Sequence, residues 1–312
     1  MIKSSAEIIA AARELSRGDR KRRVAVAGAQ DADVLGAVRS ACDDGICEAS
    51  LFGDETTIRE LAQKNSIRLE GMDIIHQADP QSAVLGAAAM ADSGQADVIM
   101  KGFLSTSTVL KGILDRRFNL RSGPTLSHVA VLEVPAYHKL LLMTDGGMMV
   151  KPNLQQKLDL LRNAALVARA LGISPVKIAL SAAVISPVAG MPQAEEAATL
   201  VDMVRREPMV DCDVAGPMSF DQATSADVAR RLGVSNSVAG DADIFLAGSI
   251  EECNITAKSM IVFADAIFSG VIVGAKVPVS LVSRTDPVIG KKTSIALAFL
   301  VADYYQRMGG GR

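Results

Sequence analysis

The sequence has no tryptophan, and the other aromatic residues are few, so that aromatics make up 4% of its 312 positions. A hydrophobic core therefore has to be built mainly from alanine, valine, leucine, isoleucine and methionine. Hydrophobic residues nonetheless account for 49% of the chain, which is enough apolar material for one or two cores. The length fits one large domain or two domains of ordinary size.

Cysteine is also scarce, and Cys42, Cys47, Cys212 and Cys253 form no Cys-x-x-Cys pair. Disulfide frameworks and structural zinc sites need paired or regularly spaced cysteines, so free thiols in a reducing compartment are the better interpretation. The start of the chain has no charged region followed by an apolar stretch. No apolar run reaches the roughly 20 residues that cross a bilayer. We therefore expect a cytoplasmic location and no membrane partner.

Neither sign of charge is in large excess. Lysine and arginine total 33 against 35 aspartates and glutamates, a formal net charge of −2, so we expect no nucleic-acid partner. The basic run Arg20-Lys21-Arg22-Arg23 is interpreted as a solvated helix end before a strand. Two nucleotide-binding signatures are missing as well. There is no Gly-x-x-x-x-Gly-Lys-[Ser/Thr] loop and no Gly-x-Gly-x-x-Gly after a strand, which argues against ATP or NAD bound by those loops.

Short apolar runs alternate with amphipathic segments in the first part of the chain. Strands are expected at residues 23–28, 49–53, 72–75 and 96–100, and helices at residues 31–44, 54–64 and 80–93. Such alternation is typical of βαβ units, whose strands form a parallel sheet.

The middle of the chain interrupts this alternation. Residues 128–134 and 140–144 are apolar runs joined by a link too short for a crossover helix, so they should form antiparallel neighbours. Alternation then resumes, with helices expected at residues 153–171, 193–207, 220–232, 251–264 and 291–307 and strands at residues 177–183, 210–214, 243–247, 270–275 and 279–282. We predict an α/β protein of two domains with mostly parallel sheets: residues 1–123 with 270–312, and residues 124–269. Ligands are expected in a cleft outside the carboxyl ends of the strands.

Two segments have the chemistry of an anion site. Ser283-Arg284 follows the last predicted strands, and a hydroxyl beside a guanidinium fork suits a phosphate. Lys101 ends the strand at 96–100 and is followed by Ser105 at a helix start, where free N–H groups favour anions, and by Lys111. The alternative for the second segment is a helix cap beside two surface lysines.

Three further segments carry polar side chains that suit either substrate binding or a purely structural role. Ser127-His128 is not interpreted as a nucleophile and base, because adjacent strand residues point to opposite faces, so a positioning role for Thr125, Ser127 or His128 is expected. Asp145 follows a strand and suits a hydrogen-bond acceptor or a turn cap better than a metal ligand. Asn254 and Lys258 share a helix face and suit a phosphate or a pantetheine amide, or simply a solvated face.

Together these segments resemble the phosphate acetyltransferase and phosphate butyryltransferase family, and the butyryltransferase branch more closely. The matching pieces are Met100-Lys101-Gly102, Leu120-Arg121-Ser122-Gly123, Ser127-His128-Val129-Ala130-Val131, Thr144-Asp145, Ala239-Gly240-Asp241-Ala242-Asp243-Ile244, Val273-Gly274-Ala275, Ser283-Arg284 and Ser294-Ile295-Ala296-Leu297-Ala298. The resemblance implies reversible acyl transfer between CoA and inorganic phosphate, with both as substrates and no permanently bound cofactor or metal. It also implies a fold similar to the isocitrate and isopropylmalate dehydrogenases, an interdomain site, and a homodimer or larger homo-oligomer.

By the same resemblance, Ser283 and Arg284 are the catalytic contacts for phosphate or the thioester oxygen. Lys111 is a second anion contact, at a position where relatives tend to carry arginine. The implied substrate-binding residues are Lys101, Ser105, Arg121, Thr125, Ser127, His128, Asp145, Asn254 and Lys258.

The sequence departs from the family pattern at three positions. Acetyltransferase relatives carry an acid at a position that aligns with about Gly290, while Asp286 lies nearer the Ser-Arg pair, and Cys253 and Ala257 replace a glycine and a tyrosine. These departures leave rate and acyl preference open. One alternative is a non-catalytic acyl-CoA-binding or regulatory relative. The other is an NAD(P)-dependent decarboxylating dehydrogenase, for which the clustered aspartates and the arginine-rich strand are not visible.

Overall fold

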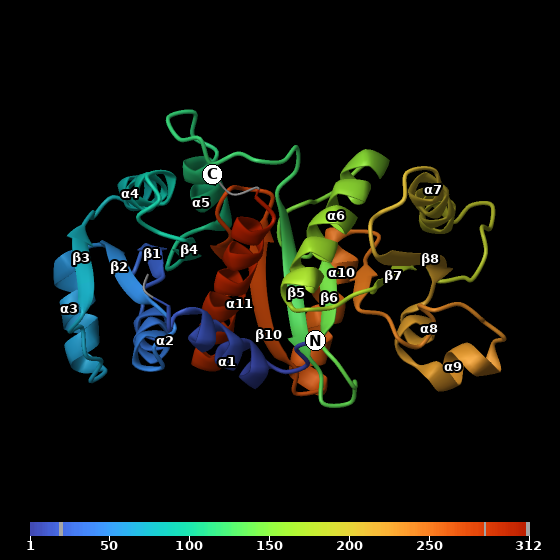
Figure 1. The fold of residues 1–312 in the computed structure, drawn as a ribbon, viewed down its shortest axis with the longest axis horizontal. Helices are drawn as coiled ribbons and strands as arrows, with labels where there is room; N and C mark the ends of the chain where they lie inside the picture. Colours follow the sequence, from blue (N-terminus) through green and yellow to red (C-terminus); the bar gives the residue numbers. More distant parts are fainter. Residues whose placement is uncertain (19–20, 284, 310–312) are drawn as a thin grey trace. The chain divides into compact units, whose positions relative to one another are not determined.

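The computed structural model describes residues 1–18, 21–283 and 285–309 and falls into two compact units (Figure 1). We call Ser5–Leu126 with Ser269–Arg312 the terminal unit, and Met1–Ser4 with Ser127–Phe268 the middle unit. Each unit has its own strands and covering helices, and each is described by itself below.

A mostly parallel sheet forms the centre of the terminal unit. Its strands are β1 (Arg23–Ala27), β2 (Glu48–Gly53), β3 (Met72–His76), β4 (Val98–Lys101), β11 (Val279–Ser280) and the part of β10 (Ile267–Val273) that begins at Ser269. Their order is β3-β2-β1-β4-β11-β10, and only the β10–β11 pair is antiparallel. The predicted βαβ organisation of this part of the chain is thereby confirmed.

The helices of the terminal unit begin where the sequence offers capping side chains. They are α1 (Ser5–Leu15), α2 (Ala32–Asp43), α3 (Glu55–Lys64), α4 (Pro80–Asp92), α5 (Thr106–Ile113) and α11 (Val288–Arg307). Asp31, Asp54 and Asp79 each follow a strand and accept a backbone N–H of the helix that comes next, which is how the chain turns from strand to helix. Helix α4 packs on β1, β2 and β4, whereas α11 packs against α1 and α2.

Helix α11 begins about one turn before the predicted residue 291. It starts at Val288, directly after Pro287, so Gly290 lies in its first turn rather than before the helix, and Lys291 is its fourth residue rather than its first. Most of its length is buried, including Ile295 and Phe299, which are fully enclosed. A helix buried on nearly all sides shows little amphipathic pattern, and this is why the sequence placed its start too late.

The middle unit contains the antiparallel pair expected from the short link. Its strands are β5 (Ser127–Glu133), β6 (Leu141–Thr144), β7 (Val176–Ser181), β8 (Cys212–Met218) and β9 (Ile244–Leu246), in the order β5-β6-β9-β7-β8. Strands β5 and β6 are antiparallel, with Ala130 opposite Met143, which confirms the prediction. The remaining pairs are parallel.

Two expectations in the middle unit were wrong in detail. The helices are α6 (Leu154–Ala170), α7 (Pro192–Arg206), α8 (Phe220–Thr224), α9 (Ala226–Arg231) and α10 (Ile250–Phe263). The single helix predicted at 220–232 is broken at Ser225, whose backbone is extended and whose hydroxyl accepts the Val228 N–H. The strand predicted at 210–214 runs instead to Met218. It includes Pro217, which an edge strand tolerates because its outer N–H groups need no partner.

A compact ionic network lies at the amino-terminal ends of strands β6, β7 and β9 in the middle unit. Lys139 is 7% exposed, and its Nζ lies 2.6 Å from Oδ1 of Asp243, which is 1% exposed. Asp241 accepts from Lys139, Lys177 and His138 at 2.9, 2.5 and 2.8 Å. Partial burial opposes ionisation of Asp241, but these donors, Lys177 first, outweigh it and lower the pKa of its carboxyl group.

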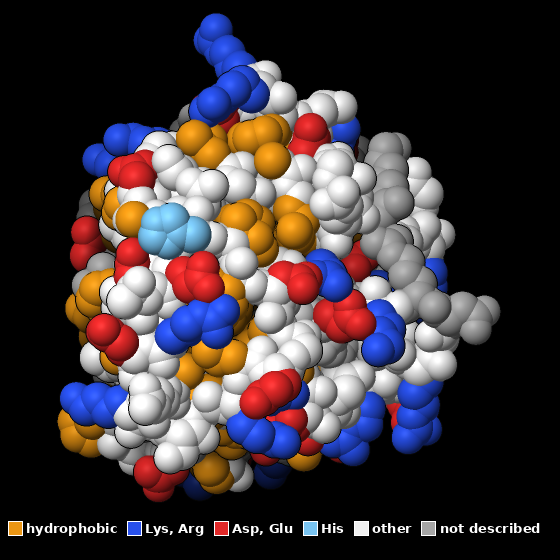
Figure 2. Space-filling model, turned by 90° about the vertical axis from the view of Figure 1, so that its left-hand side faces the viewer, with side chains coloured by type: hydrophobic (Ala, Val, Ile, Leu, Met, Phe, Trp, Pro, Cys, Tyr) orange, Lys and Arg blue, Asp and Glu red, His pale blue; other side chains and the backbone are white. Residues whose placement is uncertain are grey.

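The surface carries charges of both signs in close mixture. On the face of the terminal unit that includes α3, basic and acidic side chains are interspersed (Figure 2), and pairs such as Arg59 with Glu55 connect them. This mixture fits the small net charge and offers no broad single-sign surface on that face. Within the described residues, no helix is long and apolar enough to cross a membrane.

Candidate active site

Three parallel strands of the terminal unit end side by side. Ala27 at the end of β1 is in register with Lys101 at the end of β4, and Ser280 of β11 pairs with Met100. The chain runs outward from β1 to β2 and β3 and then returns to β4, so the crossover direction reverses between β1 and β4. In open α/β sheets, ligands bind at the carboxyl ends of the strands at such a reversal.

A small pocket lies at this reversal, and we call it the switch-point pocket. It is lined by the last residue of β4 and residues after it, by residues after β11, by the N-cap and first turn of α2, and by one residue of α11: Asp31, Val34, Lys101, Gly102, Phe103, Val282, Ser283 and Lys291. Gly102 allows the strand ends to approach closely, because a Cβ atom there would run into the carbonyl oxygen of Gly28. The pocket thus brings together Lys101 and Ser283, two of the residues that the sequence predicted.

Ser283 is held in a short turn before α11. Its backbone N–H donates to Oδ2 of Asp286 at 2.8 Å, and its hydroxyl lies 3.1 Å from that of Thr285. Asp286 is 5% exposed, so this hydrogen bond is protected from water. The predicted catalytic residue Arg284 lies outside the described residues.

Two lysines from different elements line the switch-point pocket. Lys101 is 7% exposed, and its Nζ lies 3.4 Å from the carbonyl oxygen of Gly102. Lys291 is 1% exposed; it donates to the backbone oxygen of Asp286 and lies 3.9 Å from Oδ2 of Asp33. Sequence reasoning missed Lys291. A signal was present, since a lysine in the first turn of a helix opposes the helix dipole and calls for a specific reason.

Ser105 is the N-cap of α5, and Lys111 lies in the last turn of this helix. Ser105 caps the helix by accepting the Thr108 N–H at 3.0 Å, and its hydroxyl also contacts Ser107 and Thr108. Lys111 is exposed in the last turn, six residues further along, or about 9 Å along the axis at the usual helical rise. Neither residue lines the switch-point pocket.

Arg121 and Thr125 belong to a segment of the terminal unit that lies beside the loop between β10 and β11. Arg121 forms an isolated antiparallel bridge with Ala275, and its side chain is exposed. The hydroxyl of Ser122 donates to the carbonyl of Gly274 at 3.1 Å. The carbonyl of Thr125 lies so close to Gly274 that a Cβ atom on this glycine would clash with it. The segment is therefore fixed by its backbone and leaves the Arg121 side chain in solvent.

Asp145 directly follows β6 in the middle unit, and its side chain accepts a hydrogen bond from the start of β5. It is 3% exposed, and it accepts the backbone N–H groups of His128, Gly147 and Met148, each at 2.8 Å. Three such hydrogen bonds stabilise a carboxylate and fix the turn after β6, as a turn cap does.

Ser127 and His128 point in different directions. The Ser127 hydroxyl accepts from Nδ2 of Asn163 on α6 at 2.9 Å, whereas the His128 ring stacks on Phe268 with centroids 6.1 Å apart. Both residues are buried. The two side chains therefore do not form a nucleophile–base pair.

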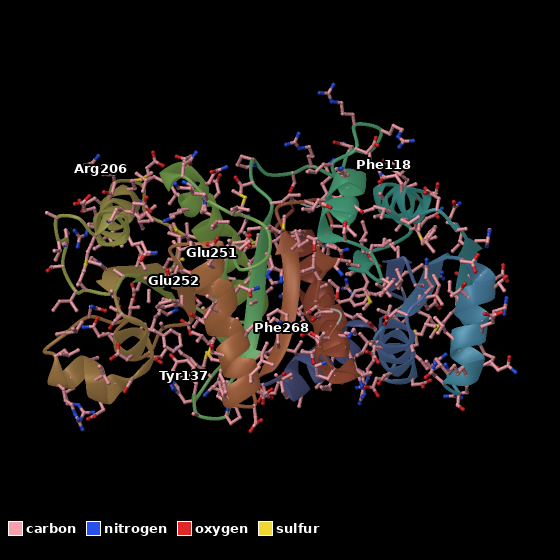
Figure 3. All side chains as sticks on the ribbon, turned by 180° about the vertical axis from the view of Figure 1, so that it is seen from behind. Phe118, Tyr137, Arg206, Glu251, Glu252 and Phe268 are labelled. Carbon is pink, nitrogen blue, oxygen red and sulfur yellow. The ribbon has the colours of Figure 1, made fainter. Side chains whose placement is uncertain are left out.

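Helix α10 brings Asn254 and Lys258 to the same part of the middle unit. Asn254 donates to the carbonyl of Gly146 at 3.1 Å, and Lys258 Nζ lies 5.8 Å from the ring centroid of Phe268. Figure 3 labels Phe268. Cys253 lies beneath them at 1% exposure, and burial raises the pKa of its thiol, so it is not an activated nucleophile. In this unit the structure brings together His128, Asp145, Asn254 and Lys258.

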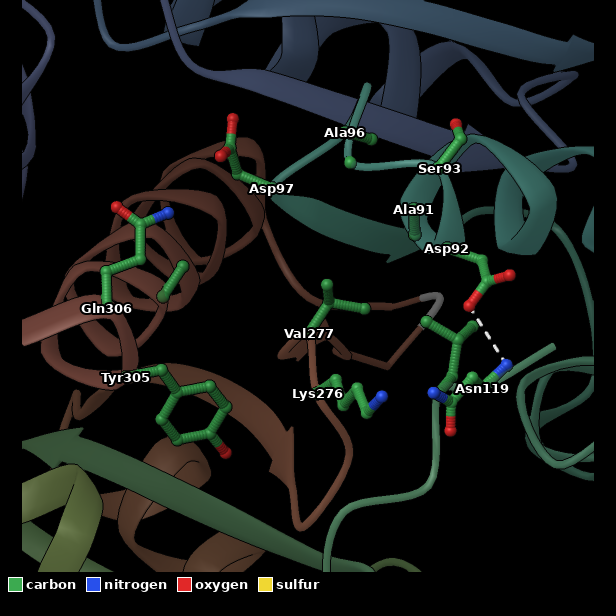
Figure 4. A pocket seen from close by; sticks show the side chains of 13 residues that line it. Ala91, Asp92, Ser93, Ala96, Asp97, Asn119, Lys276, Val277, Tyr305 and Gln306 are labelled. Carbon is green, nitrogen blue, oxygen red and sulfur yellow. Dashed lines mark hydrogen bonds between the residues drawn. The ribbon is translucent and has the colours of Figure 1, made fainter. Parts of the chain in front are cut away.

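A second cavity of the terminal unit lies at the opposite end of β4 (Figure 4). It is lined by Asp92, Asp97, Asn119, Lys276 and Tyr305 among others, and the Asn119 N–H donates to Asp92 at 2.9 Å. Burial raises the pKa of Tyr305 to about 12, which keeps its phenol neutral. None of the residues predicted for the site lines this cavity.

Comparison with known proteins supports one family. The chain matches the model described as "Phosphate acetyl/butaryl transferase" over residues 77–299. It is 39% identical over 302 residues to a phosphate butyryltransferase from Clostridium acetobutylicum, covering 97% of this chain and 99% of the relative. It is also 36% identical over 289 residues to a phosphate acetyltransferase from Thermotoga maritima, covering 93% and 98%.

Solved structures give the same result. A branched-chain phosphotransacylase from Enterococcus faecalis V583 superposes with a TM-score of 0.80 at 30% identity, covering 90% of this chain and 99% of that one. A 4-hydroxythreonine-4-phosphate dehydrogenase from Klebsiella pneumoniae, at 14% identity and a TM-score of 0.53 over 92% and 99% of the two chains, is similar in fold alone. The resemblance inferred from the motifs is confirmed, and the chain belongs to the phosphate acetyltransferase and phosphate butyryltransferase family.

Proposed function

We propose that this protein is an acyltransferase that moves a short-chain acyl group between CoA and inorganic phosphate. The family match and the near full-length similarity to butyryl- and acetyltransferases support this activity. The structural observation that carries it is the switch-point pocket, where Lys101, Lys291 and the turn of Ser283 meet at the strand ends. Cationic and hydroxyl groups in one small, largely buried place suit a phosphate.

The reaction needs orientation more than a protein nucleophile. A phosphate oxygen attacks the thioester carbon, a C–O bond forms, the C–S bond breaks, and CoA leaves as a thiolate. The thioester oxygen becomes negative on the way, so donors held in place lower the barrier. Because a thiol has a pKa of about 8.5, its thiolate is an adequate leaving group without a protein acid.

The roles of individual residues are proposals. Ser283 and Arg284 hold the phosphate or the developing oxyanion, with Lys101 beside Ser283 and Lys111 as a second anion contact. The remaining proposed substrate contacts are Ser105, Arg121, Thr125, Ser127, His128, Asp145, Asn254 and Lys258. The division into two domains at the predicted boundaries stays a prediction. So does the expectation that the substrates meet between these domains. So do the homodimer or larger homo-oligomer and the cytoplasmic location.

We propose butyryl or a similar short acyl group as the preferred cargo, because of the closer motif likeness to the butyryltransferase branch. The acetyltransferase from Thermotoga maritima is nearly as similar as the butyryltransferase, so acetyl transfer belongs to the same test.

The test is the release of free thiol from acetyl-, propionyl- and butyryl-CoA, with and without inorganic phosphate. We expect release that depends on phosphate and is fastest with one of the three thioesters. Release without phosphate would make the protein a thioesterase. No release by protein that still binds CoA would make it a non-catalytic relative. A Ser283→Ala variant that stays folded should release thiol much more slowly.

A further inference from the structure

Two of the cysteines lie against each other at the end of α2. Cys42 lies in the last turn of this helix, and Cys47 directly precedes β2. Both are free thiols, and the Cys47 thiol donates a hydrogen bond to the sulfur of Cys42. Cys42 is half-buried, whereas Cys47 is 8% exposed. Their spacing matches no Cys-x-x-Cys motif, so it is the fold that brings them together.

A tight turn after α2 holds the two cysteines in contact. Gly45 has a φ of +71°, a backbone conformation that favours glycine. Its N–H donates to the carbonyl of Cys42 at 2.9 Å. The N–H of Ile46 donates to the carbonyl of Ala41 at 3.0 Å. These two hydrogen bonds form a Schellman motif, which ends the helix and reverses the chain within a few residues. The backbone therefore fixes the thiol pair without a covalent link.

The two thiols differ in acidity. The hydrogen bond from Cys47 lowers the pKa of Cys42, and the positive charge of Arg39 lowers it further. Burial and the carboxylates of Asp43 and Glu48 oppose a thiolate here, but they do not outweigh these two effects. The hydrogen bond to Cys42 and burial raise the pKa of Cys47. One thiol is therefore suited to attack as a thiolate, and its neighbour stays protonated.

Arg39 keeps one N–H available near Cys42. Its Nη1 donates to the carbonyl of Glu70 at 2.9 Å, and its Nη2 lies 2.7 Å from Oδ1 of Asp43. Its Nε is buried and has no hydrogen-bond partner among the residues that the structure describes. Arg39 precedes Cys42 by three residues on α2, a separation at which side chains share a helix face. A guanidinium beside a thiol is an arrangement typical of reactive cysteines.

We propose that Cys42 and Cys47 are a redox-active dithiol, which a hydroperoxide converts into an intramolecular disulfide. The Cys42 thiolate attacks the peroxide; an S–O bond forms, the O–O bond breaks, and hydroxide or an alkoxide leaves. The Cys47 thiol then attacks the sulfenic acid of Cys42, so that an S–S bond forms and water leaves. Two thiols are oxidised, one peroxide is reduced, and a dithiol reductant reverses the change.

The geometry allows the second step to follow the first quickly. Two sulfur atoms already in hydrogen-bond contact reach a disulfide of about 2.05 Å by small side-chain rotations. The half-exposed Cys42 is open to a small peroxide, and the buried Cys47 is placed to react with Cys42 instead of with solvent. Capture by Cys47 also protects Cys42 from irreversible oxidation beyond the sulfenic acid. The pair is independent of the proposed acyl transfer, so its test needs no turnover.

The experiment treats the reduced protein with hydrogen peroxide and maps its thiols over time. A protease that cleaves before Asp43 and Asp44 separates the two cysteines, so their disulfide appears as two joined peptides. We expect these joined peptides in protein that forms no covalent dimer on a non-reducing gel, and we expect dithiothreitol to separate them. This result in the wild type does not depend on any variant being folded.

Cys212 is the matched control within the same chain. It is also half-buried, and its sulfur lies 3.2 Å from Nη2 of Arg169, but this contact is an arginine instead of a thiol and burial raises its pKa. We expect Cys42 to react at least about tenfold faster than Cys212, the difference that one pKa unit makes in thiolate content. Oxidation of Cys212 before any Cys42–Cys47 disulfide has formed would overturn the proposal.

Serine variants separate the two steps. In Cys47→Ser, no disulfide should form, and Cys42 should accumulate as a sulfenic acid that dimedone labels. In Cys42→Ser, Cys47 should stay unreacted, because it is buried and protonated. Cys212→Ser should form the disulfide at the wild-type rate. A Cys47 that reacts as fast in folded Cys42→Ser as in the wild type would show that Cys42 is not the attacking thiol and would overturn the proposal.

Discussion

Asp286 allows the sharpest prediction, because it separates a positioning carboxylate from a catalytic base. Its Oδ2 accepts the Ser283 N–H at 2.8 Å, and the residue is 5% exposed. The carboxylate thus fixes the turn that carries the Ser283 hydroxyl to the pocket. Asp286→Ala removes the acceptor, whereas Asp286→Asn keeps an oxygen acceptor in nearly the same place and removes only the charge.

The magnitude follows from this one hydrogen bond. A hydrogen bond to a charged group contributes about 1.5–3 kcal/mol, so Asp286→Ala should lower kcat/KM by about 10- to 150-fold if the turn relaxes. Asp286→Asn should keep a neutral hydrogen bond of about 1 kcal/mol and so recover much of the activity. The assay is phosphate-dependent thiol release from butyryl-CoA across pH 6–9. The urea midpoint of each variant checks that it is folded.

Asp79→Ala is the matched control. Asp79 also accepts a backbone N–H, that of Ser82 at 2.7 Å, but it caps α4 and does not line the switch-point pocket. We expect it to lower stability slightly, as the loss of a helix cap does, and to leave kcat/KM unchanged. If Asp286→Asn is as inactive as Asp286→Ala and the pH profile loses a limb, Asp286 acts as a base and the positioning argument is refuted.

Three further predictions concern stability. Lys139→Met leaves Asp243 buried without this cation and should cost about 3–5 kcal/mol in urea unfolding; a loss below about 1 kcal/mol would contradict this. The lowered pKa of Asp241 gives stability that is present above about pH 4 and lost as pH falls, so Asp241→Asn should flatten this acid loss in urea midpoints measured at pH 3–6. Gly102→Ala should cost about 1–3 kcal/mol and lower kcat/KM, because its Cβ would meet the Gly28 carbonyl; full activity would contradict the close approach.

An exposed ion pair is the control for the Lys139 prediction. Arg59 and Glu55 pair on α3 with side chains 60% and 40% exposed, so Arg59→Met should change stability by about 0–1 kcal/mol. A similar loss in Arg59→Met and Lys139→Met would show that burial does not set the cost.

The sequence predicted the strand–helix alternation well because local patterns decide it. Short apolar runs followed by a capping aspartate, as at Asp31 and Asp54, mark both the end of a strand and the start of a helix. The antiparallel pair β5–β6 was predictable because the length of a link limits its topology. The break at Ser225 was not, since the helical pattern continues across it and only the extended backbone and the cap reveal it.

The candidate site was partly predictable because the strand order follows from the strand–helix alternation. Lys101 and Ser283 are far apart in the sequence, but both follow strands that run in parallel, so the topology brings them into one pocket. For Lys291 the sequence carried one signal, a lysine at the start of a predicted helix, but not its burial or its backbone partner. The role of Asp286 was out of reach, because its hydrogen bond to the Ser283 N–H is a tertiary contact without a sequence pattern.

The most direct test of acyl transfer to phosphate follows both products at once. Phosphorus NMR of a mixture of butyryl-CoA, inorganic phosphate and protein measures acyl phosphate, and a thiol reagent measures free CoA in the same sample. The account predicts equal amounts of acyl phosphate and free thiol, both absent without phosphate. Free thiol without acyl phosphate, or neither product from folded protein with any of the three thioesters, would contradict it.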